Sequence, residues 1–130
     1  MIATVNWRNL LLHTGYLVLR TRNYLKAAKR WAKCTVALAI VHPAFEPRLA
    51  WLAFLHVSRP YGRRGAAQAL WNAAADIAGA ADAESIYVSA TPTASAVGFY
   101  LRQHCHLARP VHPDLFAAEP DDIHFVCSLN

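Results

Sequence analysis

Two apolar runs in the middle of the chain have the composition of buried β-strands. Residues 35–41 (TVALAIV) and 51–57 (WLAFLHV) are built mainly from aliphatic and aromatic residues, which is typical of strands that are buried on both faces. The segment between them, HPAFEPRLA, contains two prolines. We therefore expect a hairpin of two mostly buried strands, joined by a connection over residues 42–50.

Downstream of the second run, the spacing of apolar positions changes from strand-like to helical. The pattern predicts an amphipathic helix from Arg64 to about Ala78, which Gly79 ends. Its apolar face carries Ala67, Leu70, Trp71, Ala74 and Ile77, and Gln68, Asn72 and Asp76 form a polar face. SIYVSA, residues 85–90, then predicts a strand, and residues 94–103 predict a second helix. These elements form a crossover unit with two parallel strands.

The two ends of the chain are less regular. Residues 15–21 (GYLVLRT) are compatible with a strand, and Asn23 is a suitable cap for a helix over residues 23–33. Near the other end, a Pro-rich connection over residues 108–122 precedes IHFVCSL, residues 123–129, whose alternation predicts a strand. We find no internal repeat, and 130 residues with 55% apolar composition are enough for one domain with its own core.

The charge of the chain favours an anionic partner. Its formal net charge is +5, and the first 45 residues hold seven basic side chains and no acidic one. A nucleotide-bearing cofactor satisfies this charge as well as nucleic acid does. Because the chain lacks a groove-reading motif or an interleaved aromatic platform, we expect a solvated helix face at the N-terminus and no nucleic-acid binding.

The cysteines and histidines do not indicate a metal or disulfide framework. Cys34, Cys105 and Cys127 are odd in number and widely spaced, and the seven histidines lack metal-ligand spacing. No continuous apolar run approaches the roughly 18–20 residues of a membrane span. We therefore expect a cytoplasmic protein without a metal and without a membrane anchor.

The stretch HVSRPYGRRGAAQALW, residues 56–71, combines features that hold phosphate. A strand ends there, the chain turns through glycine and arginine, and an alanine-rich helix begins. Free backbone N–H groups, the helix dipole and guanidinium groups converge at such a position. By itself, this pattern is also that of an ordinary helix start.

Two motifs in this order resemble the GNAT superfamily of acyl-CoA-dependent N-acyltransferases, from about Thr35 to the C-terminus. The first is the strand, turn and helix start of VSRPYGRRGAAQAL, with matching residues at Val57, Pro60, Tyr61, Gly65, Ala67 and Leu70. The second, in IYVSATPTASAVGFYLRQHC, matches at Ala96, Phe99 and Tyr100. The resemblance implies an α/β (α+β) fold with a mixed, mostly antiparallel twisted sheet, helices on both faces and reduced N-terminal elements. The sheet would splay open after Val57.

The resemblance also implies a binding site for acetyl-CoA as co-substrate. Its pyrophosphate would lie on the turn and helix start, and its pantetheine arm would pair with the backbone at the end of the strand before the turn. The residues implied are Leu55, His56, Val57, Arg63, Arg64, Gly65, Ala66, Ala67 and Thr93.

The implied activity is transfer of an acetyl group from acetyl-CoA to a primary amine of a small molecule or peptide. The amine would attack directly in a ternary complex, and Tyr100 would protonate the departing thiolate. Many relatives have a base at the positions of Trp51 or Ala53, and neither residue can accept a proton. His56 is the nearest titratable group, but strand alternation turns it away from the face of Leu55 and Val57 unless a bulge intervenes.

The other titratable side chains are weaker candidates for the base. His42, Glu46 and His124 lie on or near predicted strands, whereas His104, His106 and His112 are expected on surface loops. The interpretation of Phe99 is core packing. Family members often pair through their C-terminal strands, so a homodimer is also compatible with the resemblance.

Three departures from the family pattern leave an alternative open. Gly62 replaces the first Arg or Gln of the phosphate motif, and His104 and Cys105 replace the Gly-Phe pair that usually follows the second helix. The segment before Trp51 is also short for the family. The alternative function is a non-catalytic relative that binds CoA or acts as an interaction module.

Overall fold

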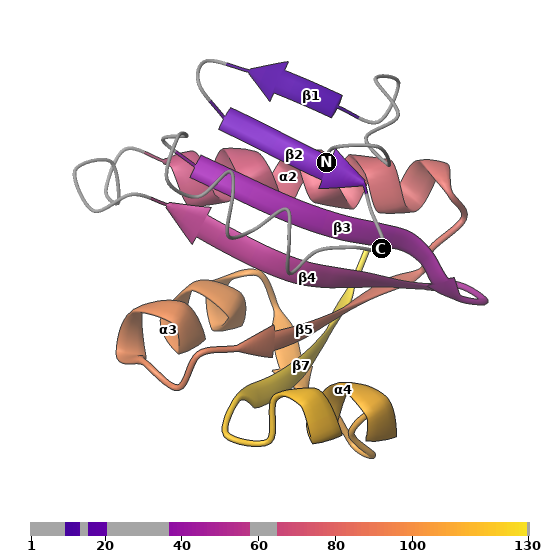
Figure 1. The fold of residues 1–130 in the computed structure, drawn as a ribbon, viewed down its shortest axis with the longest axis vertical. Helices are drawn as coiled ribbons and strands as arrows, with labels where there is room; N and C mark the ends of the chain where they lie inside the picture. The colour runs from indigo at the N-terminus through magenta and orange to yellow at the C-terminus, as the bar shows by residue number, and fades with distance from the viewer. Residues whose placement is uncertain (1–9, 14–15, 21–36, 58–64, 130) are drawn as a thin grey trace.

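The computed structural model describes residues 10–13, 16–20, 37–57 and 65–129, which form seven strands and three helices. Figure 1 shows their arrangement. In chain order they are β1 (Leu10–His13), β2 (Tyr16–Arg20), β3 (Ala37–Glu46), β4 (Leu49–Val57), α2 (Ala66–Ala80), β5 (Ser85–Ala90), α3 (Ala94–Arg102), β6 (Cys105–Leu107), α4 (Pro113–Ala118) and β7 (Ile123–Ser128).

The strands form one mixed, mostly antiparallel sheet in the order β1-β2-β3-β4-β5-β7-β6. The pairs β2–β3 and β4–β5 are parallel, and the other four pairs are antiparallel. The parallel β4–β5 pair with α2 between its strands is the expected crossover unit. The α+β class and the mostly antiparallel sheet are therefore confirmed.

The expected connection over residues 42–50 is wrong, because both strands continue into it. β3 runs to Glu46 and β4 begins at Leu49, so that only Pro47 and Arg48 turn the chain. The register of the two strands shifts between His42 and Glu46. Such an irregularity accommodates a proline within a strand, which is why the two prolines falsely indicated a long loop.

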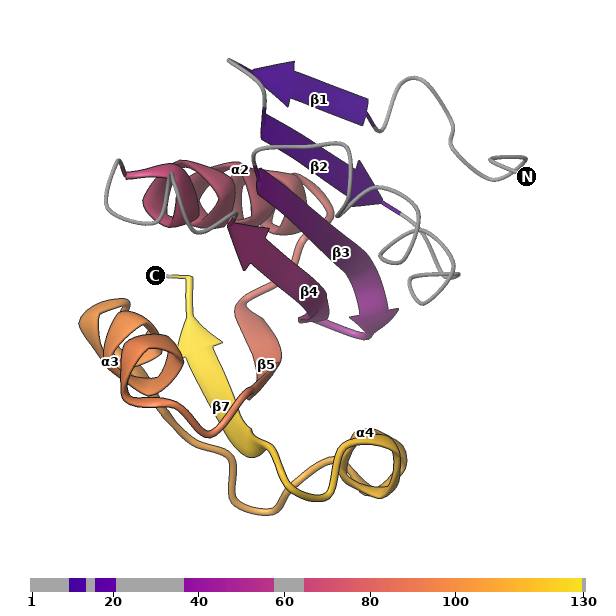
Figure 2. The same ribbon diagram turned by 60° about the vertical axis from the view of Figure 1, so that its left-hand side comes forward.

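β4 contains one extra residue at the point where it separates from β5. Ile40 pairs with Phe54 but Val41 pairs with Leu52, so Ala53 forms a β-bulge. The pairing of β4 with β5 stops at Leu52 opposite Val88. Beyond this pair the two strands diverge, and the halves of the molecule on either side separate, as Figure 2 shows. The splay expected after Val57 thus begins five residues earlier, at the bulge.

Helices cover both faces of the sheet. α2 and α3 pack on one face, over an apolar cluster that includes Leu52, Val88 and Phe125. The short helix α4 packs on the other face, where Leu115 meets Tyr87. Alternate residues of β5 and β7 supply the two sides, as the period of two in a strand requires.

The ends of the chain contain both confirmed and missed elements. β2 confirms the strand expected within residues 15–21, whereas the helix expected over residues 23–33 lies outside the described residues. The connection expected over residues 108–122 contains α4, and the short strand β6 was not predicted. The expectation of no disulfide is also wrong, because Cys105 and Cys127 are bonded across β6 and β7.

Candidate cofactor and active site

The last residues of β4 lie on the open side of the splay. Leu55, His56 and Val57 pair with β3, but none of them pairs with β5. Their second backbone edge is therefore directed toward the opening. The bulge precedes Phe54, so Leu55 and Val57 pack toward α2, whereas His56 stacks with Phe54 on the opposite face. The expected orientation of His56 is confirmed.

The start of α2 has the backbone of an open helix terminus. Gly65 is its N-cap, with a left-handed φ of 76° that a glycine adopts without strain, and no side chain caps the terminus. A Cβ atom built at Gly65 would meet nothing within 4 Å. Ala66 is buried beneath this terminus, and Ala67 is half-buried. Arg63 and Arg64 lie outside the described residues.

The start of α3 lies at the end of β5, on the other strand of the splay. Thr93 is the N-cap of α3, and its hydroxyl accepts a hydrogen bond from the Ala96 N–H at 3.2 Å. This hydroxyl therefore stabilises the helix start. Because β4 and β5 are parallel, α2 and α3 both begin at the same edge of the sheet.

Tyr100 projects from α3 into the apolar face. It is 6% exposed, and its ring contacts the rings of Trp71, Phe99 and Phe125 at centroid distances of 6.0, 5.2 and 6.1 Å. Burial raises the pKa of the Tyr100 hydroxyl well above the usual value. A raised pKa makes this phenol a weaker proton donor than an exposed tyrosine. The packing expected for Phe99 is also present.

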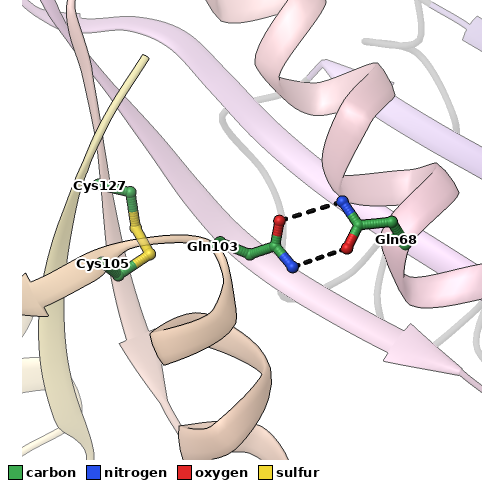
Figure 3. The surroundings of a disulfide bond; sticks show 4 residues. All are labelled: Gln68, Gln103, Cys105 and Cys127. Atoms are coloured by element: carbon green, nitrogen blue, oxygen red, sulfur yellow. Dashed lines mark hydrogen bonds between the residues drawn. A yellow bond between two sulfur atoms is a disulfide. The ribbon is translucent and has the colours of Figure 1, made fainter. Parts of the chain in front are cut away.

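A hydrogen-bonded amide pair joins α2 to α3, and sequence analysis missed it. Gln68 donates to the Gln103 side chain at 3.0 Å, and Gln103 donates back to Gln68 at 2.7 Å. Figure 3 shows this pair beside the bond between Cys105 and Cys127. The helical spacing placed Gln68 on a polar face, but no sequence signal connects it to a residue 35 positions away.

The opposite face of the sheet contains a buried tyrosine–histidine pair. The Tyr87 hydroxyl lies 2.7 Å from Nδ1 of His124, while Nε2 of His124 lies 3.0 Å from the Glu119 carbonyl. A carbonyl only accepts, so Nε2 carries the proton and Nδ1 accepts from Tyr87. Tyr87 in turn accepts from the His112 N–H at 3.0 Å. These bonds connect β5 and β7 to the start of α4.

His112 is not the exposed loop residue that we expected. It is the N-cap of α4, and its Nε2 lies 2.8 Å from Glu46. Its side chain is only 14% exposed because Phe45 and Tyr87 pack against it. His104 is exposed in a turn, as expected, whereas His106 is exposed but lies in strand β6 and not in a loop.

The position that many relatives use for a base lies on this same face. Trp51 pairs with Tyr87 across β4 and β5 and packs on Phe45. Ala53 is the bulge residue. Among the described residues, no three His, Cys, Asp or Glu side chains are placed to hold a metal ion.

The model for the acetyltransferase (GNAT) family matches residues 14–105 of this chain. This match covers the strand, turn and helix start at the splay as well as the helix that carries Tyr100. The chain belongs to the GNAT acetyltransferase family. The match begins before Thr35, where the resemblance in sequence begins, and it ends at Cys105, the last residue of the second motif.

Solved structures with the same fold are distant in sequence. An acetyltransferase of the GNAT family from Staphylococcus aureus Mu50 is 17% identical with a TM-score of 0.56, over 65% of this GNAT chain and 54% of the other. N-acetylglutamate synthase from Neisseria gonorrhoeae, complexed with coenzyme A and N-acetyl-glutamate, is 18% identical with a TM-score of 0.63, over 99% and 31%. Ard1 from Thermoplasma volcanium is 14% identical with a TM-score of 0.56, over 79% and 74%.

This chain matches only part of two of these proteins. The chain spans about half of the Staphylococcus acetyltransferase and about a third of the Neisseria synthase. None of the curated proteins matches the chain. In the described part of this GNAT protein, no helix is long and apolar enough to cross a membrane.

Proposed function

We propose that residues 1–130 form one N-acetyltransferase domain that transfers an acetyl group from acetyl-CoA to a primary amine of a small molecule or peptide. The splay between β4 and β5 carries this proposal. It leaves a backbone edge at residues 55–57 unpaired with β5, next to an uncapped helix start at Gly65. This arrangement suits an extended amide chain that ends in a pyrophosphate.

The proposed cofactor residues divide between the two arms of the splay. Backbone groups of Leu55, His56 and Val57 would pair with the pantetheine arm, and Thr93 would flank it from α3. The N–H groups of the turn and helix start would hold the pyrophosphate, together with guanidinium groups. The residues proposed for the phosphates are Arg63, Arg64, Gly65, Ala66 and Ala67.

Tyr100 is the residue that we propose as the proton donor. Acetyl-CoA supplies the thioester, the amine nitrogen attacks its carbonyl carbon, and the C–S bond breaks. The thiolate leaves as a base with a pKa of roughly 8.5 for its thiol. Burial raises the pKa of the Tyr100 phenol, which disfavours transfer of its proton to this thiolate, so the role proposed for Tyr100 rests on its place in the second motif.

The amine must also lose a proton. For an alkyl amine with a pKa of about 10.4, deprotonation at neutral pH costs about 4–5 kcal/mol. Trp51 and Ala53 cannot accept this proton, and His56 is the titratable group nearest to the bulge along β4. This lack of a base at the usual positions favours the second candidate function, a CoA-binding module without catalytic activity.

Isothermal titration of the full chain with acetyl-CoA tests the cofactor site. We expect micromolar binding, and weaker binding of ADP, at each of two salt concentrations. Gly65→Glu should weaken acetyl-CoA binding at least about thirtyfold, because a carboxylate would face the pyrophosphate. Gly65→Ala is the control for strain at the left-handed φ. Absence of binding to the folded wild-type chain would overturn the proposal.

A screen of primary amines then separates the two functions. Transfer of acetyl from acetyl-CoA, followed by release of free thiol, would identify the enzyme. We expect Tyr100→Phe to lower kcat about tenfold to a hundredfold without weakening acetyl-CoA binding. Tight cofactor binding without transfer to any amine would favour the binding module.

We also propose a homodimer that pairs along β6. This strand is last in the sheet order, and Leu101 and Leu107 nearby are about half exposed. Light scattering after size exclusion should give twice the chain mass of 14.4 kDa. A single-chain mass at high concentration would contradict this proposal.

The expected cytoplasmic location stays a proposal. The bond between Cys105 and Cys127 argues against it, because disulfides persist mainly outside the reducing cytosol. Alkylation of free thiols in intact cells, followed by mass spectrometry, tests both the location and the disulfide. Modified Cys105 and Cys127 would support a reducing compartment.

A further inference from the structure

The helices α2 and α3 stand on different arms of the splay but contact one another in two layers. In the inner layer, Trp71 of α2 meets the edges of Phe99 and Tyr100 at centroid distances of 6.4 and 6.0 Å. The outer layer is the exposed amide pair of Gln68 and Gln103. Together, the two layers connect the proposed phosphate helix to the helix of the proposed proton donor.

Additional hydrogen bonds orient each member of the amide pair. Gln68 uses its second N–H to donate to the Asn72 side chain at 2.9 Å, one turn along the same helix. Gln103 is the C-cap of α3, and its backbone N–H donates hydrogen bonds to the last carbonyl groups of that helix. Within the described residues, these two amide bonds are the side-chain hydrogen bonds that link α2 to α3.

The pair joins the first turn of α2, which begins at the open edge of the splay, to the C-terminal end of α3. The closed side is held by backbone pairing of β4 with β5 up to Leu52 and Val88. Gln68 follows Gly65 by three residues, so it belongs to the first turn of α2. One arm of the splay consists of β4 and α2, and the other of β5 and α3. Strand hydrogen bonds hold the two arms together up to Leu52 and Val88. The amide pair and the aromatic contacts beneath it hold them together a second time, between α2 and α3.

We propose that Gln68 and Gln103 are positioning residues that set the width of the splay for the pantetheine arm and hold Tyr100 in place across it. This inference rests on the proposed function. Neither side chain needs to touch the cofactor. Each amide bond contributes modestly in water, so loss of the pair should weaken acetyl-CoA binding about 5- to 30-fold.

Titration calorimetry with acetyl-CoA and with ADP tests this role in the full chain. Gln68→Ala and Gln103→Ala should each weaken binding of acetyl-CoA, which occupies the splay. Both should leave binding of ADP unchanged, because ADP occupies only the phosphate site on α2. The double variant should bind no more weakly than either single variant, because both remove the same pair.

A rescue variant and a control complete the experiment. Gln68→Leu combined with Gln103→Leu replaces the amide pair by an apolar contact, adds no charge to the first turn of α2, and should recover most of the acetyl-CoA affinity. Asp76→Ala, at an exposed position further along α2, should bind both ligands like the wild type. Each variant should unfold within about 8 °C of the wild type, since loss of the pair removes only about 1–2 kcal/mol of stability.

The outcomes separate this inference from the proposed function. A wild-type chain that does not bind acetyl-CoA overturns the proposed function and this inference with it. If the wild type binds and the two alanine variants bind equally well, only the positioning role is overturned. It is also overturned if ADP binding falls in the same proportion, or if the apolar contact of the double leucine variant restores no affinity.

Discussion

The face of the sheet under α2 and α3 and the face under α4 bury different kinds of side chain. The first is a continuous apolar cluster into which Tyr100 inserts. The second contains His124, which is the one buried polar or charged residue in the described part of the chain, and hydrogen bonds connect it to Tyr87 and α4. Packing volume should therefore dominate stability on one face, and hydrogen bonding on the other.

The contrast fits the proposed use of the two faces. Beside the first face, residues 55–57 of β4 do not pair with β5, and no side chain caps the start of α2 at Gly65, so these backbone groups are open to a ligand. On the other face, Tyr87 and His124 satisfy one another and the start of α4. The substitutions below should therefore change the free energy of unfolding by different amounts on the two faces.

The largest effect should come from Phe125→Ala on the apolar face. Phe125 is 1% exposed and contacts Tyr100, so the variant leaves a cavity beneath α3. We expect the free energy of unfolding to fall by about 3–5 kcal/mol, measured by denaturation with urea. Ser95→Ala, at an exposed position on the same helix, should change it by less than about 0.5 kcal/mol. Equal effects would contradict this account of the core.

Loss of the bond between Cys105 and Cys127 should follow in size. The two residues are 22 positions apart. Closing a loop of that length stabilises the folded state by about 3 kcal/mol in the chain-entropy account. We expect this loss when urea unfolding is repeated in a thiol reductant, while a variant with both cysteines changed to alanine should be insensitive to the reductant. A thiol titration that finds every cysteine free would contradict the bond itself.

Two tyrosines, one on each face, give a matched comparison. Tyr87→Phe leaves the His112 N–H and Nδ1 of His124 without the hydroxyl that bonds both. Unfolding should become easier by about 1–3 kcal/mol. The Tyr100 hydroxyl makes no hydrogen bond within the described residues, so Tyr100→Phe should cost nearly nothing. A larger loss for Tyr100→Phe would reverse the assignment of polar and apolar faces.

Alkaline pH should weaken the fold through the same two residues. Burial raises the pKa of both Tyr87 and Tyr100 above the unfolded value of about 10. The unfolded chain therefore loses these protons first, so stability is complete below about pH 10 and falls as the pH rises further. The slope should be about 1.4 kcal/mol per pH unit for each tyrosine. Unfolding measured between about pH 8 and 11.5 should show a shallower slope for Tyr100→Phe, and an unchanged slope would contradict its burial.

Sequence analysis located the helices and strands that are long enough for their apolar positions to repeat several times. The helix that begins at Ala66 and the strand at Ser85 follow from repeated apolar positions, and so does their parallel crossover. The strand β6 and the helix α4 have three and six residues. A period cannot be recognised over such lengths, and prolines next to α4 indicated a loop instead.

The candidate site was only partly accessible from the sequence. The motifs predicted roles for Gly65 and Tyr100 from their local order along the chain, and these roles stay predictions, while Arg63 and Arg64 lie outside the described residues. Gln103 and His112 depend on contacts with residues 35 and 66 positions away. Such contacts follow from tertiary packing, which no local pattern specifies.

The smallest predicted effect concerns His104, where the chain departs from the family glycine after the second helix. His104 has a φ of 63°, so it adopts the left-handed conformation without the residue that favours it. His104→Gly should raise the free energy of unfolding by about 0.5 kcal/mol, since relief of this strain exceeds the entropy that glycine adds to the unfolded chain.

A matched variant tests whether the backbone is the cause. His106→Gly lies two residues away in the extended strand β6, where glycine should destabilise by about 0.5–1 kcal/mol. Both histidines are exposed, so loss of either imidazole affects neither buried face. Opposite signs for the two variants would assign the effect to φ at His104. The same sign for both would show that the side chain, and not the left-handed turn after α3, determines the cost at this position.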